Sequence, residues 1–154
     1  MPGEALFREH GKQVAALCWR PSPKRASGIE VLLITSLNSK RWIMPKGWPE
    51  PDLSGSENAA REAFEEAGIS GTIDADPLGS FHHKKRSLFG TVDVEILVHL
   101  LAVEKELTEW PERGQRERKW FPVKEAASVV DSDDLGELIA RVGKRLKNGK
   151  KSAR

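Results

Sequence analysis

Apolar residues along the chain fall into two patterns, continuous runs and strict alternation, and both predict strands. Residues 13–20 and 29–35 are apolar almost throughout, which is typical of strands buried on both faces of a sheet. Residues 91–105 alternate instead, with an apolar side chain at every second position from Val92 to Leu100. Alternation of this kind indicates a strand with one apolar face. Two central strands and one long strand with a buried face are therefore predicted.

Shorter segments complete the predicted architecture. Further extended segments are expected at residues 41–44, which Pro45 ends, and at residues 71–81 and 120–121. Residues 122–130 begin like a helix. A clearer helix follows Ser132, the candidate cap, because the apolar residues after it recur at helical spacing: Leu135, Leu138, Ile139, Val142 and Leu146. Strands interleaved with helices predict an α/β sandwich around a mixed sheet.

The segment from Ser54 to Gly68 predicts the best-marked helix. Ser54 and Glu57 have the spacing of a capping box, and Gly68 suits the left-handed position that ends a helix. One face of this helix is apolar and consists of Ala60, Ala63, Phe64 and Ala67. Because that stripe is expected to pack on the core, the acidic residues of the same helix are expected to point away from it.

Three carboxylates in that helix, Glu62, Glu65 and Glu66, are the principal chemical signal in the chain. Their spacing places them on one helical face, where like charges repel one another. A hard divalent cation such as Mg²⁺ or Mn²⁺, bound through oxygen, neutralises such a face. A glutamate-rich helix that is merely solvated is the alternative. The stiff turn at residues 44–49, which contains Gly47, lies shortly before the helix and favours the metal site.

Composition limits the class of protein to which the chain can belong. Its 154 residues are 38% hydrophobic and 31% charged, which suits one compact soluble domain. The net charge of +2 is too small to indicate general nucleic-acid binding. The single cysteine, Cys18, lies in an apolar run and is expected to be a buried small hydrophobe rather than a nucleophile. Since the chain has neither a membrane-length apolar run nor a signal-peptide pattern, a cytoplasmic enzyme is the expectation.

The segment from Gly47 to Ile69 resembles the Nudix box, G-x5-E-x7-R-E-U-x-E-E-x-G-U, in which U is an aliphatic residue. The matching positions are Gly47, Arg61, Glu62, Glu65, Glu66, Gly68 and Ile69, with Ala63 at an aliphatic position. One position departs from the pattern, because its first Glu falls on Leu53. In the family that Glu supports the loop and the Arg, and Glu50 or Asp52 are candidates to replace it here.

The resemblance to the Nudix family implies a Nudix-type α/β/α sandwich and cleavage of a phosphoanhydride bond by water that attacks phosphorus. The implied metal ligands are Glu62, Glu66, a backbone carbonyl of Lys46 or Gly47 and, as a further ligand or instead as the general base, Glu65. Arg61 is assigned to the catalytic machinery in a supporting role. It is expected to orient a Glu of its own helix rather than to contact the substrate.

Features outside the box indicate the substrate class. Residues 82–86 form a basic run between two extended segments, and residues 110–112 precede a second basic and aromatic run at 116–121. Together with residues 45–48, these features resemble the diphosphoinositol polyphosphate phosphohydrolase branch, whose members also cleave diadenosine polyphosphates. A substrate with many phosphates needs many cationic donors, and the candidates are Lys84, Lys85, Arg86 and Arg116. An ordinary solvated hairpin loop is the alternative for residues 82–86.

Two other functions stay open at this point. One keeps the chemistry but acts on nucleoside triphosphates or nucleotide sugars, and the other is a nucleotide-sensing module without catalysis. A small-molecule polyphosphate is the expected partner, with no membrane or nucleic acid, and the oligomeric state is left open. Residues 12–147 are expected to form one Nudix domain between a flexible N-terminus, 1–11, and a flexible basic tail, 148–154. Contact with an anionic partner is the alternative for that tail.

Overall fold

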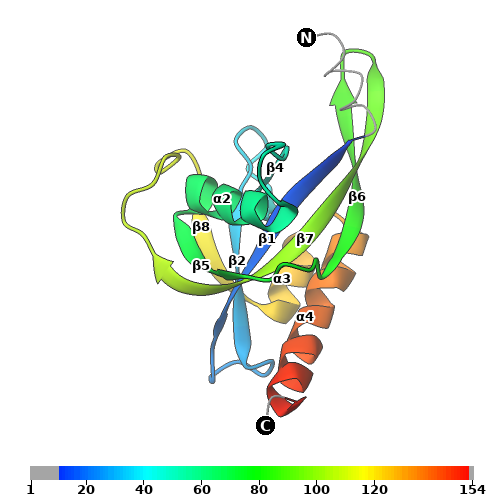
Figure 1. Ribbon diagram of the computed structural model, residues 1–154. Helices are drawn as coiled ribbons and strands as arrows, with labels where there is room; N and C mark the ends of the chain where they lie inside the picture. Colours follow the sequence, from blue (N-terminus) through cyan, green and yellow to red (C-terminus); the bar gives the residue numbers. More distant parts are fainter. Residues whose placement is uncertain (1–10, 153–154) are drawn as a thin grey trace.

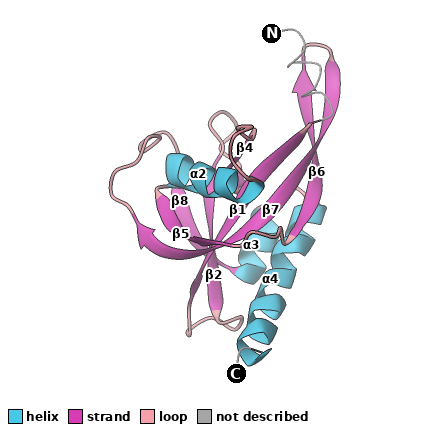
Figure 2. Cartoon of the chain, viewed as in Figure 1, coloured by secondary structure: helices cyan, strands magenta, loops and turns pink. Residues whose placement is uncertain are grey.

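A mixed β-sheet forms the centre of the molecule, and helices cover both of its faces (Figures 1 and 2). The computed structural model describes residues 11–152. Their helices and strands, in chain order, are β1 (Lys12–Pro21), β2 (Ile29–Thr35), β3 (Trp42–Ile43), β4 (Lys46–Gly47), α2 (Gly55–Ala67), β5 (Ile69–Ile73), β6 (Gly79–Ser87), β7 (Gly90–Glu106), β8 (Arg118–Pro122), α3 (Val123–Val129) and α4 (Asp133–Ser152).

The order of the strands makes the sheet mixed, as predicted. The main path runs β3-β2-β1-β7-β5, while β4 pairs with β1, β6 with β7 and β8 with β2. β1 and β7 are parallel, with Cys18 opposite Leu101, whereas the other pairs are antiparallel. The long strand β7 pairs with β6 over its first half and with β5 over its second half. The predicted α/β sandwich around a mixed sheet is confirmed.

The continuous apolar run of β1 is explained by burial on both faces of the sheet. Ala15 and Leu17 contribute to the core under α3 and α4, whereas Ala16 and Cys18 contribute to the core under α2. Cys18 is fully buried, and burial raises the pKa of its thiol to about 12, so it is the inert hydrophobe that was predicted. The alternating apolar residues 92–100 of β7 all face the α3–α4 core, as the pattern indicated.

The ends of α2 confirm the predicted capping signals. Ser54 and Glu57 form the reciprocal capping box, and Gly68 adopts the left-handed conformation with φ of 66°. The predicted orientation of the helix was partly wrong, because Phe64 is 42% exposed and Glu66 is only 7% exposed. The acidic face is not open to solvent throughout, since the loop before α2 folds back over it.

The basic run at residues 82–86 lies inside strand β6 and not in a hairpin loop. The turn between β6 and β7 is formed by residues 88–89. The alternative of an ordinary hairpin loop is therefore wrong, because pairing with β7 holds every residue of the run in register. The segment predicted as extended at 71–81 is split, since β5 ends at Ile73 and β6 begins at Gly79.

The C-terminal helix α4 begins where its cap was predicted. The Ser132 hydroxyl accepts a hydrogen bond from the Leu135 N–H at 3.2 Å. The helix continues to Ser152, so the boundary predicted at residue 148 falls within it. The expectations for residues 1–10 and 153–154 lie outside the described part of the chain. Among the helices described, none has the length and apolar character needed to cross a membrane.

Candidate active site

The turn before α2 packs its backbone directly on the acidic face of the helix. β4 pairs with β1, with Gly47 opposite Val14, and this pairing holds the turn against α2. The Lys46 N–H donates a hydrogen bond to Glu66 Oε1 at 3.3 Å. A Cβ atom added at Gly47 would lie 2.6 Å from Cδ of Glu62, which is closer than real Cβ atoms approach. Glycine at this position is therefore what lets the Glu62 carboxyl group lie against the turn.

The two carboxyl groups of Glu62 and Glu66 share one small, partly buried space. Burial raises the pKa of Glu66 to about 8, and the hydrogen bond and charge of Glu62 reinforce this, while Arg116 and the Lys46 N–H oppose it. Burial also raises the pKa of Glu62. Without a counter-ion, two such carboxyl groups are most stable when they share a proton. A cation between them can take the place of that proton.

Glu65 does not join the other two carboxyl groups. It accepts a hydrogen bond from Arg61 Nε at 2.9 Å, one turn away on the same helix, and its side chain is 33% exposed. The hydrogen bond with Glu65 is the main cause that raises the pKa of Arg61. Within residues 11–152, no three acidic, histidine or cysteine side chains gather closely enough to hold an ion by themselves. Exposed pairs of this kind contribute little to stability, so Glu65 is free to turn toward a cation.

The donor atoms of the turn and helix fit a hard divalent ion. Glu62 and Glu66 supply carboxylate oxygens in a partly buried setting, and the backbone of Lys46 and Gly47 lies directly beside them. Oxygen donors of this kind suit Mg²⁺ or Mn²⁺ and do not suit a soft metal. The backbone carbonyl of residue 46 or 47, and Glu65 after rotation, remain the predicted further ligands.

Asn58 is a supporting residue that the sequence analysis missed. It is 3% exposed, and its Nδ2 donates to the carbonyl oxygens of Glu50, Leu53 and Ser54 at 3.1, 3.3 and 3.0 Å. Its Oδ1 accepts from the Glu50 N–H at 2.8 Å. The loop around Leu53 is thus held by Asn58, while the charge of Glu50 contributes to the raised pKa of Arg61. The signal available in the sequence was an asparagine in the first turn of the helix, because its side-chain amide can hydrogen-bond to the backbone of the loop just before it.

A cavity of about 790 Å³ adjoins the acidic face of α2, and we call it the cationic cavity. Its lining includes Glu66 and Lys46 from the metal-site region and Arg41 from the segment before β3. The four side chains predicted to bind substrate also line it, namely Lys84, Lys85, Arg86 and Arg116. The fold therefore brings two of the predicted metal-site residues, Lys46 and Glu66, to one cavity with the predicted phosphate-binding residues, whereas Gly47, Glu62 and Glu65 are not part of its lining.

Alternation along β6 divides the basic run into two sets. His83 and Lys85 are half-buried, whereas Lys84 and Arg86 are exposed. The ammonium group of Lys85 lies 5.5 Å from the ring centroid of Trp48, which itself packs against the core. Lys85 is consequently the member of the run whose position is best defined.

Cationic side chains outnumber carboxylates in the lining of the cationic cavity, where Asp131 pairs with Arg41 and Glu66 lies near Arg116. The pKa of Lys46 is lowered, first by burial and then by the charge of Lys85, although Glu66 opposes the shift. The pKa of His83 is lowered by burial and then by Lys46 and Lys85. In the described residues, neither Lys46 nor Lys85 has a carboxylate within ion-pair distance. Uncompensated cations in a half-buried hollow attract a polyanion.

Arg116 connects the cationic cavity to the acidic helix. Its side chain is 10% exposed, and its Nη1 donates to the Thr35 carbonyl at 3.2 Å. Its Nη2 lies 3.9 Å from Glu66 Oε1. The guanidinium is therefore held in place beside a predicted metal ligand.

Glu112, in the loop between β7 and β8, is a second residue that the sequence analysis did not assign. It accepts a hydrogen bond from Arg116 Nε at 3.0 Å, and its N–H donates to the Glu65 carbonyl at 3.1 Å. Its charge contributes to the raised pKa of Glu62. Glu112 lies in a segment without helical or strand periodicity, so no pattern in the sequence placed it near α2.

The family model of the NUDIX domain matches residues 10–142. The chain belongs to the Nudix family. Nudix hydrolase 12, mitochondrial, of Arabidopsis thaliana is 42% identical over 107 residues, which are 66% of this chain and 52% of that protein. Diphosphoinositol polyphosphate phosphohydrolase 3-beta of Bos taurus is 34% identical over 122 residues, 77% of this chain and 68% of that protein. The chain spans about half the length of the plant Nudix hydrolases it matches.

Solved structures of other proteins share the fold. The Ap4A hydrolase of C. elegans matches with a TM-score of 0.62 and 22% identity, over 88% of this chain and 97% of that one. The NUDIX domain of Shewanella oneidensis NrtR, solved with ADP ribose, matches with a TM-score of 0.67 and 17% identity, over 92% of both chains. At these identities the likeness shows the Nudix fold alone.

Divalent ions are expected to stabilise this Nudix domain more at alkaline than at acidic pH. Because the pKa of Glu66 is raised in the folded protein, its contribution to stability is full below about pH 4.5 and is lost as the pH rises through about 8. An ion that binds the deprotonated carboxylates of Glu62 and Glu66 restores this contribution to stability. Mg²⁺ or Mn²⁺ should raise Tm by about 4 °C or more near pH 8.5 and by clearly less near pH 6, measured by calorimetry. Equal shifts in Tm at both pH values would contradict an ion site shared by Glu62 and Glu66.

Proposed function

We propose that the chain is a divalent-metal-dependent hydrolase that cleaves phosphoanhydride bonds through attack of water on phosphorus. The substrates proposed are diphosphoinositol polyphosphates or dinucleoside polyphosphates. The observation that carries the proposal is the cationic cavity, whose lining combines Glu66 of the acidic helix with Lys46, Lys85 and Arg116. A site of this composition suits a ligand with several phosphate groups next to a divalent ion.

The proposed roles follow from the contacts of each residue. Glu62, Glu66 and a backbone carbonyl of residue 46 or 47 would hold the ion. When bound, Mg²⁺ or Mn²⁺ neutralises phosphate oxygens and lowers the pKa of a water molecule. Glu65 would remove the proton of the attacking water or complete the ligand set, and Arg61 holds its carboxylate on the helix surface.

The cations of the cavity bind the phosphate chain and stabilise charge as the bond breaks. Lys46 and Lys85 have no carboxylate within ion-pair distance among the described residues, so their charges are available to the substrate. Arg116 offers a planar guanidinium that Glu112 and Thr35 orient. The bovine relative named for diphosphoinositol polyphosphates supports this substrate class.

Location in the cytoplasm remains a prediction from the sequence. Three of the plant relatives carry the word mitochondrial in their names, and one carries chloroplastic.

The substrate proposal is tested with a panel of diadenosine polyphosphates, diphosphoinositol phosphates, nucleotide sugars and oxidised nucleoside triphosphates. The highest kcat/KM is expected for a substrate with a long or dense phosphate chain. Lys85→Ala should raise KM for that substrate about tenfold, equivalent to about 1.4 kcal/mol of lost binding. Lys105→Ala, at an exposed lysine outside the lining of the cavity, is the matched control and should change KM less than about threefold.

The same panel of substrates distinguishes the proposed function from the two alternative functions. A preference for nucleotide sugars or single nucleoside triphosphates, with no effect of Lys85→Ala, would contradict the role of the cationic cavity. Absence of any product with Mg²⁺ or Mn²⁺ would support a nucleotide-sensing module without catalysis.

A further inference from the structure

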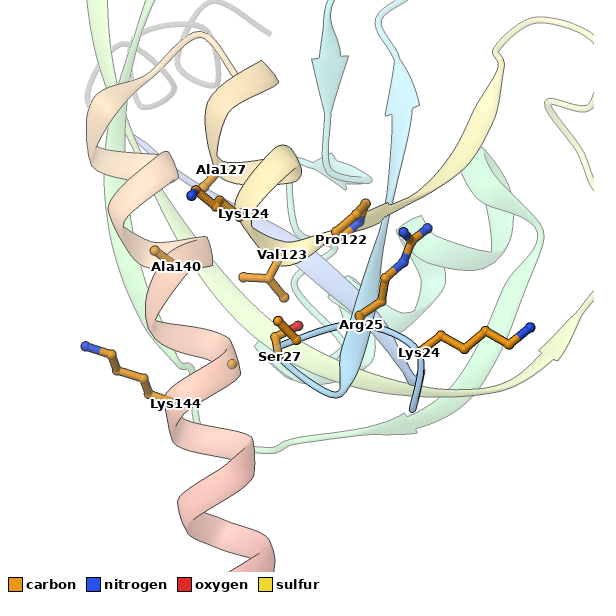
Figure 3. Close-up of a pocket in the computed structure, with 11 residues that line it drawn as sticks. Lys24, Arg25, Ser27, Pro122, Val123, Lys124, Ala127, Ala140 and Lys144 are labelled. Carbon is orange, nitrogen blue, oxygen red and sulfur yellow. The ribbon is translucent and has the colours of Figure 1, made fainter.

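A second hollow lies between the β1–β2 loop, the start of α3 and the middle of α4 (Figure 3). We call it the α3–α4 pocket. Its volume is about 650 Å³, and its lining shares no residue with that of the cationic cavity. This volume falls within the roughly 300–1,000 Å³ of sites that enclose small ligands or inserted side chains. The proposed hydrolase activity gives it no role.

The floor of the α3–α4 pocket is apolar. Val123 and Ala127 of α3 face Ala140 and Gly143 of α4 across it, and Ser27 of the β1–β2 loop lies near Gly143. Small side chains at these positions leave the hollow open. None of the residues that line it is aromatic, so it offers no surface on which a nucleotide base can stack.

The rim of the α3–α4 pocket carries four cationic side chains and, among its lining residues, no acidic one. Lys144 projects from α4, whereas Lys24 and Arg25 project from the β1–β2 loop on another side of the hollow (Figure 3). Lys124 stands at the start of α3. Arg25 donates from Nε to Glu30 at 2.8 Å, which leaves its terminal nitrogens for a further acceptor.

The distribution of these charges indicates the chemistry of the ligand. Because Lys24 and Lys144 project in opposite directions (Figure 3), one phosphate or carboxylate does not contact both of them. A ligand with several separated negative charges and one apolar group matches both the rim and the floor. An acidic peptide has this combination, since its carboxylates are spaced along a backbone and a neighbouring side chain can be apolar.

We propose that the α3–α4 pocket docks an acidic peptide segment of a partner protein. The segment inserts an aliphatic side chain over Val123, Ala127 and Ala140. Its carboxylates pair with Lys24, Lys124 and Lys144 at the rim. The partner binds on a surface distinct from the cationic cavity, so a bound partner leaves the substrate entrance free.

The test is fluorescence anisotropy with a short labelled peptide that combines glutamates with one central leucine. The full chain is expected to bind it at physiological ionic strength, more weakly as salt is added. The variant K124E/K144E should lose at least tenfold in affinity. Ala140→Trp should lose a similar factor, because the indole of this exposed helix position fills the hollow. The control K105E/R141E makes the same change of charge at exposed residues outside the pocket and should bind as the unaltered chain does.

Hydrolase activity and circular dichroism are measured on the same samples and should not change in any of these variants. Any one of three results would overturn the proposal. These are failure of the peptide to bind the unaltered chain, a loss of affinity in the control variant as large as that in K124E/K144E, and normal binding of the peptide by Ala140→Trp. Vesicles rich in anionic phospholipid serve as a competing probe, and pocket-dependent binding to vesicles without binding to the peptide would assign the surface to lipid instead.

Discussion

Glu66→Gln is expected to lower kcat by about three orders of magnitude, or roughly 4 kcal/mol of transition-state stabilisation, while the fold stays intact. Glutamine keeps the size of the side chain but cannot replace a charged oxygen ligand. The metal-free variant should be at least as stable as the unaltered chain near pH 8, because the raised pKa of Glu66 shows that its charged form is disfavoured there.

The matched control for this prediction is Glu137→Gln, the same change at an exposed position of α4. It should leave kcat and Tm unchanged. Steady-state kinetics in Mg²⁺ and Mn²⁺, together with calorimetry, provide the measurements. Near-normal turnover by Glu66→Gln would show that Glu66 is not a metal ligand.

Gly47→Ala is expected to lower kcat by about thirtyfold or more although it adds a single methyl group. The new Cβ would lie 2.6 Å from Cδ of Glu62, so the carboxyl group or the turn must move. Displacement of a ligand by about 1 Å is enough to reduce turnover by a factor on the order of 100. The affinity for Mn²⁺, followed by titration calorimetry, should fall together with kcat.

Gly55→Ala is the control for this change, since an added Cβ at Gly55 meets nothing closer than 3.4 Å. It lies in the first turn of α2 and should preserve activity. If Gly47→Ala and Gly55→Ala had equal activity, the close approach of the turn to Glu62 would not matter for catalysis.

The fold was predictable wherever local pattern decides structure. The capping box of Ser54 and Glu57, the left-handed Gly68 and the cap at Ser132 were all read from short-range spacing. The burial of β1 on both faces followed from its continuous apolar run. Contacts within a few residues determine these features, so the sequence carries them directly.

The site was less predictable because its features depend on contacts between distant segments. Glu66 was expected on an exposed face, but the turn at residues 46–47 folds over it and buries it. Asn58 and Glu112 were missed because their hydrogen-bond partners lie in loops, and a loop has no periodic sequence pattern from which its course can be predicted. The basic run was identified from composition, yet only its pairing with β7 distinguishes the half-buried Lys85 from the exposed Lys84.

Crystals soaked in Mn²⁺ and measured at the anomalous edge of manganese test whether the acidic face of α2 binds a divalent ion. An anomalous peak is expected between the carboxyl groups of Glu62 and Glu66, against the turn formed by Lys46 and Gly47. Glu65 should then be turned away from Arg61 and toward the ion or its water. No peak at that position, with Glu65 still bound to Arg61 in saturating Mn²⁺, would show that these residues do not form the metal site.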